Sequence, residues 1–358
     1  MKKGYLVLAD GQVFEGIRFG AETDSVGELV FTTSVVGYIE TLTDPSYAGQ
    51  IVMQTYPLVG NVGIIHADKQ GACCVKGYIA REFCDAPSNF RSDDTLESFL
   101  KAEGVPALYG VDTRQLTRII RDNGVMNAMI CSEIPADLDV VKTYAIAGKV
   151  IEVTCKEAEV FPAEGEEQHK VAMIDYGVKR GVIAGLQQRG CTVTLVPATT
   201  TAEEILAMGV DGVALSNGPG DPAENEFQIA QVKALMGKLP MFGLGLGHQL
   251  MALAAGGKTY KLKYGHRGGN QPVIDLSCDR TYVTSQNHGY NVVAESVDPA
   301  VAKISHINAN DKSCEGLEYI GKPVFTVQFH PAISSAPVDT SYIYDKFLKM
   351  MDNSKEGK

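Results

Sequence analysis

The most constraining stretch of this sequence is a glycine-rich corner within residues 239–257, which read LPMFGLGLGHQLMALAAGG. An apolar segment leads into the corner, and leucines and alanines at helical spacing follow it. A strand, a tight corner and a helix form a nucleophile elbow, G-x-Nuc-x-G, whose central residue presents its side chain at a strained tip. Gly243 and Gly247 match the flanking glycines, and the tip is Gly245. Because glycine has no side chain, the sequence predicts an elbow without a nucleophile.

A dinucleotide-binding turn is the alternative interpretation of the same glycines. That turn follows the pattern G-x-G-x-x-G and needs an acidic residue about 20 positions further on. Counted from Gly243 and Gly245, the third glycine would fall at position 248, where the chain has His248. The fingerprint therefore fails at its third glycine, and the elbow is the better interpretation.

Length and composition indicate a soluble protein of two domains. The chain has 358 residues, of which 45% are hydrophobic and 21% charged, enough for two packed cores. A formal net charge of −11 argues against binding to nucleic acid. The eight cysteines form no C-x-x-C pair and no cluster of zinc spacing, so we expect reduced thiols, a cytoplasmic protein and no metal. We expect neither a signal peptide nor a membrane span.

Changes of hydrophobic pattern divide the chain into two domains and a linker. Residues 1–148 read as a β-rich α/β domain of short strands and turns. Residues 149–169 are charged and are expected to form an exposed linker. In residues 170–358 strands alternate with helices, which predicts an α/β domain with a mostly parallel sheet flanked by helices. In such sheets, functional sites lie at the carboxyl ends of the strands.

Several strings resemble a known family. The corner, FGLGLGHQL, resembles the class I glutamine amidotransferase signature, whose fourth residue is normally the cysteine that attacks the glutamine amide. Four strings resemble the N-terminal domain of the small, glutamine-hydrolysing subunit of carbamoyl-phosphate synthase: GYIETLTDPSY (37–47), YPLVGNVG (56–63), SNFR (88–91) and GVDTRQLTR (110–118). Other class I amidotransferases lack this domain. The resemblance therefore implies docking to a large synthetase subunit.

The resemblance also implies that the hydrolytic chemistry has been lost. Hydrolysis of a glutamine amide needs a thiolate, a histidine that activates it, a carboxylate that orients the histidine, and two N–H donors for the oxyanion. The family carries its histidine and carboxylate in F-H-P-E, whereas this chain reads F-H-P-A. His330 is retained, Ala332 stands at the acid position, and Gly245 stands at the cysteine position. Ser334 and Ser335 are alternative nucleophiles, but their loop offers no identifiable oxyanion donors.

The residues that bind glutamine in the family are matched more fully. By resemblance, Gly218 and Gly220 in SNGPGDP (216–222) bind the α-groups of glutamine and supply one oxyanion donor, and Leu246 supplies the second. The other expected ligand contacts are Gln249, Asn287, Gly289, Tyr290 and, from the first domain, Ser46.

Three functions fit these matches. The first is a carbamoyl-phosphate synthase small-subunit homologue that keeps a glutamine pocket but cannot hydrolyse glutamine. Its partner would be the large subunit or a homologue, which would hold ATP and magnesium, so no cofactor is expected in this chain. The second is a glutamine-binding regulatory subunit. The third is a repurposed enzyme that uses His330 as an acid or base in the same pocket. Neither nucleic acid nor membrane is an expected partner.

Overall fold

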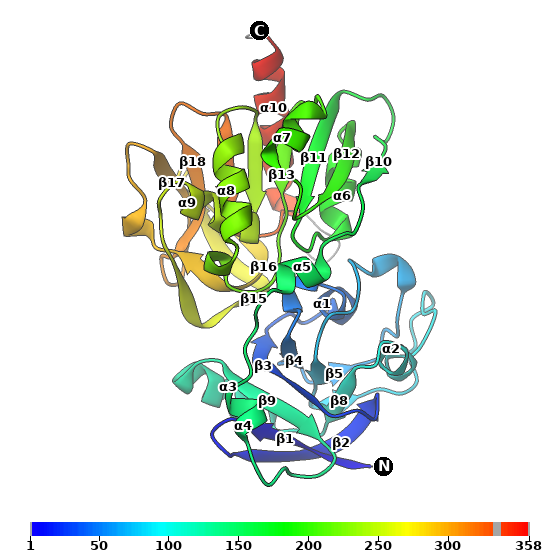
Figure 1. Cartoon of the computed structure of the whole chain (residues 1–358). Coiled ribbons are helices and arrows are strands. Elements are labelled where there is room, and N and C mark those ends of the chain that lie inside the picture. Colours follow the sequence, from blue (N-terminus) through cyan, green and yellow to red (C-terminus); the bar gives the residue numbers. More distant parts are fainter. Residues whose placement is uncertain (1, 332–337, 357–358) are drawn as a thin grey trace. The chain divides into compact units, whose positions relative to one another are not determined.

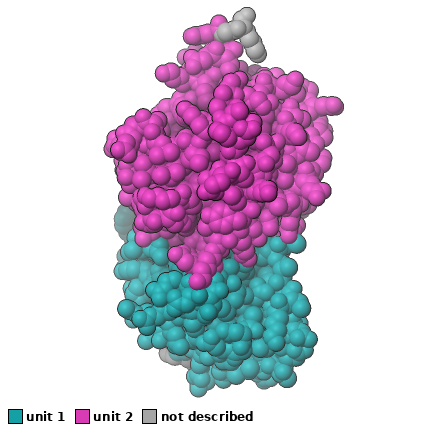
Figure 2. Space-filling model, turned by 90° about the vertical axis from the view of Figure 1, so that its left-hand side faces the viewer, with its two compact units in different colours: residues 1–147 teal, residues 148–358 magenta. Residues whose placement is uncertain are grey.

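The computed structural model describes residues 2–331 and 338–356 (Figure 1). The chain divides into two compact units, Met1–Ala147 and Gly148–Lys358, which Figure 2 distinguishes by colour. Within the described ranges, no helix combines the length and the apolar character needed to cross a bilayer.

Unit 1 is built on a closed β-barrel, in agreement with the β-rich pattern of its sequence. In order around the barrel, the strands are β1 (Lys3–Leu8), β2 (Val13–Gly20), β8 (Pro106–Tyr109), β6 (Gly77–Ile79), β4 (Gln50–Gln54), β3 (Ser25–Thr32) and β9 (Met126–Cys131). A further pair is β5 (Leu58–Val59) with β7 (Glu82–Phe83), and the helices are α1 (Tyr38–Leu42), α2 (Leu96–Ala102), α3 (Thr113–Asn123) and α4 (Asp139–Lys142).

Helix α3 shows how the sequence builds unit 1. Asp112 caps the helix, because its side chain accepts a hydrogen bond from the backbone N–H of Gln115 at 2.9 Å. Leu116 and Ile120 are buried one turn apart and join Ile51 and other barrel residues in one core cluster. The amphipathic face of the helix is therefore stabilised by packing on the strands.

Unit 2 contains a ten-stranded sheet with helices on both faces. In spatial order the strands are β10 (Glu159–Phe161), β12 (Cys191–Pro197), β11 (His169–Asp175), β13 (Gly212–Leu215), β14 (Met241–Leu244), β19 (Val324–Val327), β18 (Cys314–Tyr319), β17 (Ala302–Asn308), β15 (Thr259–Asp275) and β16 (Arg280–Val292). The helices are α5 (Lys149–Val153), α6 (Arg180–Gln187), α7 (Ala202–Ala207), α8 (Glu226–Leu235), α9 (Leu246–Ala254) and α10 (Tyr342–Glu356).

The α/β fold class is confirmed, although the sheet is mixed rather than mostly parallel. Strands β12, β11, β13, β14 and β19 run parallel to their neighbours in this group, whereas β10 and the series β18, β17, β15 and β16 pair antiparallel. The reason lies in the connections. After residue 258 the strands follow one another through short turns, and a short turn can join only antiparallel neighbours.

Two apolar cores cover the two faces of this sheet. Along β11, Val171 and Met173 belong to the core shared with α6 and α10, whereas Ala172 and Ile174 belong to the core shared with α7, α8 and α9. This alternation follows from the two-residue period of a strand that is buried on both faces. The parallel strands are thus held rigidly, and their carboxyl ends provide a firm base for loops.

Residues 149–169, predicted as a linker, instead belong to unit 2. They form α5 and the edge strand β10, in which Glu159 pairs with Leu195 and Phe161 with Val193 of β12. Of the charged side chains that suggested a linker, Glu159 lies in β10, whereas Glu164, Glu166 and Glu167 lie in the exposed connection between β10 and β11. A charged surface connection within a domain and a linker between domains give the same composition.

Candidate functional site

Three of the predicted strings leave neighbouring parallel strands at the same edge of the unit 2 sheet. The S-N-G-P-G-D-P turn follows β13, the glycine corner follows β14, and the Q-F-H-P string follows β19. Leu215 pairs with Gly243, and Leu244 pairs with Val327. The sheet therefore brings together residues separated by more than a hundred positions, at the edge where α/β sheets carry their sites.

The glycine corner has the backbone geometry of a nucleophile elbow. Gly245 has φ 53° and ψ −109°, a conformation that L side chains rarely adopt. A Cβ on Gly247 would lie 2.6 Å from the carbonyl oxygen of Leu215, and one on Gly243 would lie 2.9 Å from Cγ2 of Thr326. Both flanking glycines are therefore required by close packing.

The tip of the elbow faces the S-N-G-P-G turn. A Cβ on Gly245 would lie 3.1 Å from Cβ of Asn217, so a side chain there would project beside that turn. Helix α9 begins at the next residue, Leu246, and the N–H groups of a first helical turn have no partner within the helix. The tip therefore stands at the positive end of a helix, a position that favours an anion such as an oxyanion or a thiolate.

The turn itself is packed directly against the elbow. A Cβ on Gly218 would lie 2.3 Å from the carbonyl oxygen of Tyr176 and 2.8 Å from Cδ2 of Leu246, so only glycine fits. Gly220 has φ 86° and open space around it, so the backbone conformation, and not a close contact, favours glycine at this position. Asn217 anchors the turn, since its Nδ2 donates to the carbonyl of Gly177 at 2.8 Å.

His330 lies at the same edge, and its side chain is buried. Its backbone N–H donates to the carbonyl of Ser285 at 2.9 Å, which links it to the S-Q-N-H-G-Y string of β16. The hydroxyl of Tyr344 on α10 donates to the carbonyl of Pro331 at 3.1 Å and fixes the segment from the other side. Ala332, Ser334 and Ser335 lie outside the described residues.

Gln249 and Gln328 connect the elements around the site. The Nε2 of Gln249 donates to the carbonyl of Tyr290 at 2.7 Å and to Oε1 of Gln328 at 2.9 Å. Helix α9 is thereby joined to β16 and to the segment after β19. The sequence analysis predicted Gln249 as a site residue but not Gln328. The only indication for Gln328 in the sequence is that it stands two residues before His330.

The residues of the S-Q-N-H-G-Y string alternate between the two faces of β16. Asn287 and Gly289 are partly exposed, whereas Gln286 and His288 are buried. Asn287 and Gly289 therefore share a face from which a ligand can be contacted, and His288 points to the other. The backbone carbonyl of Tyr290 accepts from Gln249.

Ser46 belongs to unit 1, in the short 3-10 turn Pro45–Tyr47, and it is buried. The side chain of Asp44 accepts a hydrogen bond from the backbone N–H of Ser46 at 3.0 Å and fixes this turn. The ligand-contact roles of Ser46, Gly218, Gly220, Leu246, Gln249, Asn287, Gly289 and Tyr290 stay predictions.

Burial suppresses the ionisation of one histidine and three cysteines in unit 2. It lowers the pKa of His248, the third residue after the elbow tip, to about 3, so this histidine is neutral and its Nδ1 pairs with Oγ1 of Thr326 at 2.7 Å. It also raises the pKa of the Cys155 thiol to about 11 and those of Cys191 and Cys314 to about 12. These three thiols are weak candidates for a substitute nucleophile, because the thiolate is the reactive form.

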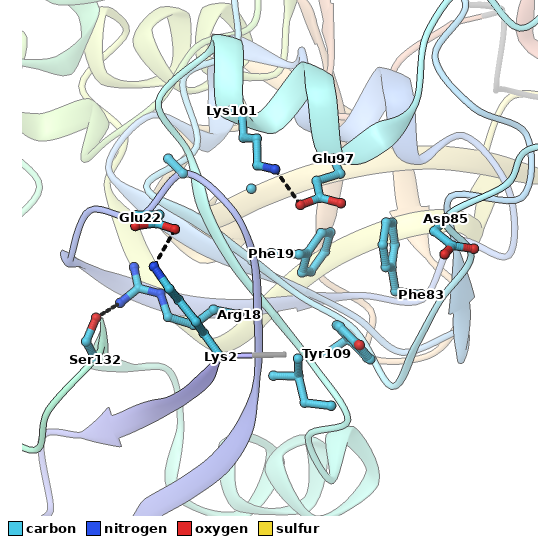
Figure 3. A pocket seen from close by; sticks show the side chains of 13 residues that line it. Lys2, Arg18, Phe19, Glu22, Phe83, Asp85, Glu97, Lys101, Tyr109 and Ser132 are labelled. Atoms are coloured by element: carbon cyan, nitrogen blue, oxygen red, sulfur yellow. Dashed lines mark hydrogen bonds and ion pairs between the residues drawn. The ribbon is translucent and has the colours of Figure 1, made fainter.

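A separate pocket of about 610 Å³ lies in unit 1 (Figure 3). Phe19, Phe83 and Tyr109 form an aromatic wall, in which the rings of Phe19 and Phe83 stack at 4.5 Å between centroids. Its charged side chains include the ion pairs Lys2–Glu22 and Lys101–Glu97, both at 2.6 Å. Each of these pairs is neutral as a whole, and the lining also includes Arg18 and Asp85.

One group of described residues has the donors to hold a metal ion. The ligand atoms of His266, His288 and Glu315 in unit 2 lie within 4.8 Å of one another, and all three residues are buried. The cluster lies on the buried face of β16, opposite the face that carries Asn287 and Gly289.

Comparison with known proteins matches both units. Residues 6–130 match the family described as carbamoyl-phosphate synthase small chain, CPSase domain, and residues 172–350 match glutamine amidotransferase class-I. A carbamoyl phosphate synthase small chain of Fusobacterium nucleatum is 47% identical over 98% of each chain. The small chain of Syntrophotalea carbinolica is 46% identical over 99% of each chain. That of Listeria monocytogenes serotype 4b is 44% identical over 100% of this chain and 99% of the relative. This chain therefore belongs to the carbamoyl-phosphate synthase small chain family, with a class I glutamine amidotransferase domain as its second unit.

Proposed function

We propose that this chain is a carbamoyl-phosphate synthase small subunit that binds glutamine but does not hydrolyse it. The observation that carries the proposal is the elbow tip. Gly245 has the left-handed backbone of a nucleophile residue, at the amino end of α9, and offers no atom that could attack an amide. The missing carboxylate at Ala332 supports the same conclusion from the sequence.

Retention of the glutamine pocket is supported by packing that is independent of the nucleophile. Gly218 touches the elbow directly, and Gln249 holds α9 to the strand that carries Asn287. A pocket maintained by close contacts of this kind keeps its shape without the cysteine. The remaining N–H donors at the start of α9 would still face the amide oxygen of a bound glutamine.

Two measurements on the purified chain test this proposal. Isothermal calorimetry with glutamine should give binding, and an assay for ammonia or glutamate should give no turnover above background. Ammonia release at the rate of an intact amidotransferase would refute the loss of hydrolysis. Absence of heat at millimolar glutamine would refute the proposal that the chain binds glutamine.

A matched pair of variants ties any binding to the predicted turn. Gly218→Ala should abolish the glutamine signal, because its new Cβ would overlap the carbonyl oxygen of Tyr176 at 2.3 Å. Gly209→Ala is the control, since a Cβ on Gly209 would meet open space, unlike one on Gly218. Gly209 has a positive φ, 65°, so an alanine there strains the backbone without any clash. Equal binding by both variants would contradict the assignment of the turn.

We also propose that unit 1 docks on a large synthetase subunit, which would then use free ammonia as its nitrogen source. The relatives of this chain are carbamoyl phosphate synthase small chains. Unit 1 is the part that matches the CPSase domain of that family. Phe90, in the S-N-F-R string, is 95% exposed. A large aromatic side chain in full contact with water is a favourable anchor for a partner protein.

Glutamine sensing is the alternative that the same pocket supports. A chain that binds glutamine without consuming it can report its concentration to a partner by favouring one conformation. The two roles differ in one measurement. Glutamine should change the ammonia-dependent activity of a reconstituted complex if the chain is a sensor, and should leave that activity unchanged if the pocket is only a structural remnant.

A further inference from the structure

Two histidines and a glutamate from three strands meet on the buried face of the antiparallel part of the unit 2 sheet. His266 of β15 pairs directly with His288 of β16, and their rings stand edge to face with centroids 5.0 Å apart. Glu315 of β18 completes the group and is fully buried. None of the three is among the predicted glutamine contacts, and Asn287 and Gly289 lie on the opposite face of β16.

The outward nitrogen of each histidine has a fixed hydrogen-bond acceptor. Nε2 of His266 donates to Oδ2 of Asp311 at 2.9 Å, and Nδ1 of His288 donates to the carbonyl of Tyr290 at 2.8 Å. A carboxylate or backbone carbonyl behind a histidine is the arrangement that orients histidine ligands in metal sites. In the neutral rings, the lone pairs are therefore on Nδ1 of His266 and Nε2 of His288.

Both lone pairs point at oxygen atoms. Nδ1 of His266 is buried without a hydrogen bond, 3.5 Å from Oε1 of Glu315. Nε2 of His288 lies 3.1 Å from Oε1 of Gln286, whose Nε2 is directed at Glu315 and Thr284 by hydrogen bonds of 3.0 and 3.1 Å. Two acceptors that face each other repel unless a positive charge lies between them. The site therefore needs a proton or a cation.

A single proton does not serve both contacts. On Nδ1 of His266 it would satisfy the contact with Glu315 and leave Nε2 of His288 facing Oε1 of Gln286. A metal ion can accept a lone pair from each of these atoms at once.

We propose that His266 Nδ1, His288 Nε2 and a carboxylate oxygen of Glu315 bind a divalent transition-metal ion, with Oε1 of Gln286 as the fourth ligand. One such ion resolves both acceptor contacts.

The donor set favours zinc or cobalt. Imidazole nitrogen and carboxylate oxygen suit these ions, and four ligands in a closed, buried site are typical of a structural role. A tetrahedral ion with bonds of about 2.0–2.1 Å would draw together ligand atoms that now lie within 4.8 Å of one another. Its effect would be to brace β15, β16 and β18 behind the S-Q-N-H-G-Y string.

Cobalt binding to the full-length chain tests the site. We expect one equivalent of Co²⁺ with a visible d–d spectrum of tetrahedral type and no thiolate charge-transfer band. Glu315→Gln should weaken binding by at least about 100-fold, and it keeps the size and hydrogen-bonding capacity of the buried side chain. His306→Gln is the matched control, since His306 is a buried histidine of the same sheet outside the cluster, and it should bind cobalt as the unaltered chain does.

Crystals of the unaltered chain soaked with Zn²⁺ give a test that does not depend on variants. An anomalous peak at the zinc edge between His266, His288 and Glu315 is the expected result. A cobalt complex with a thiolate band, equal affinity in Glu315→Gln, or soaked crystals without a peak in this position would each overturn the proposal.

Discussion

If this chain lacks glutaminase activity, as proposed, a cysteine at position 245 together with a glutamate at position 332 should give it that activity. The perturbation is the double variant Gly245→Cys with Ala332→Glu, compared with Gly245→Cys alone. The new thiol would stand at the amino end of α9, where the helix dipole lowers the pKa of a cysteine and favours the thiolate. The elbow backbone, the helix terminus and His330 are already present, so only the reacting groups are being added.

The cost of the new side chain follows from the geometry at the tip. A Cβ on Gly245 meets Cβ of Asn217 at 3.1 Å and Cα of Asn217 at 3.3 Å, so that residue must move by a few tenths of an ångström. Because of this contact and of the left-handed φ of 53°, we expect Gly245→Cys to lower the free energy of unfolding by about 1–3 kcal/mol. Gly256→Cys is the control, since Gly256 follows the same helix with φ 92° and open space.

The gain in rate can be bounded from a protease triad. There, loss of the nucleophile or histidine costs about 2 × 10⁶ in kcat, and loss of the acid alone costs about 3 × 10⁴. By analogy Gly245→Cys alone should gain about 10²-fold over the unaltered chain, and the double variant up to about 10⁶-fold. A coupled assay for glutamate measures the rates. Fast hydrolysis by the unaltered chain, or by Gly256→Cys, would refute the reasoning, as would a folded, glutamine-binding double variant without turnover.

Three further outcomes are expected. Phe90→Ala should weaken binding to a large subunit by at least about tenfold in a titration, while Val140→Ala, at another exposed site of unit 1, should not. The free energy of unfolding should fall as the pH drops from about 6.5 towards 4. In this range His248 binds a proton in the unfolded chain but stays neutral in the folded one, where burial lowers its pKa to about 3. Chemical denaturation of His248→Gln should show a dependence on pH that is smaller by about 1.4 kcal/mol per pH unit. Gly247→Ala should lower the melting temperature more than Gly209→Ala, because its Cβ would meet a backbone carbonyl at 2.6 Å.

The features of the site that the sequence predicted are those with local causes. The glycines of the corner are each required by a close approach or by a positive φ, so their spacing alone indicates the turn. The strings after β13, β14 and β19 meet because parallel strands end at one edge. The β-rich character of unit 1 and the α/β class of unit 2 follow from strand and helix periods in the same way.

What the sequence could not predict depends on residues far apart in the chain. The strand β10 is recognisable only through its pairing with β12, and the charged residues around it suggested a linker. The cluster of His266, His288 and Glu315 arises from the register of β15 with β16, which is shifted by irregularities between Lys261 and His266 and again between Gly268 and Gln271. The expectation of no metal rested on the spacing of cysteines and histidines in the sequence, and such spacing carries no information about this register.

The sharp turn of the elbow is required by the packing of its flanking glycines and does not depend on a nucleophile at the tip. Gly243 and Gly247 are pressed against β19 and β13, and the chain between them must turn sharply whatever residue stands at the tip. A cysteine at position 245 would hold a left-handed φ at a cost in stability, whereas glycine adopts the same φ without that cost. If this chain does not hydrolyse glutamine, as proposed, the residue that best stabilises this corner is glycine. A chain with Gly245→Ala should then be less stable than the unaltered one, and neither chain should hydrolyse glutamine.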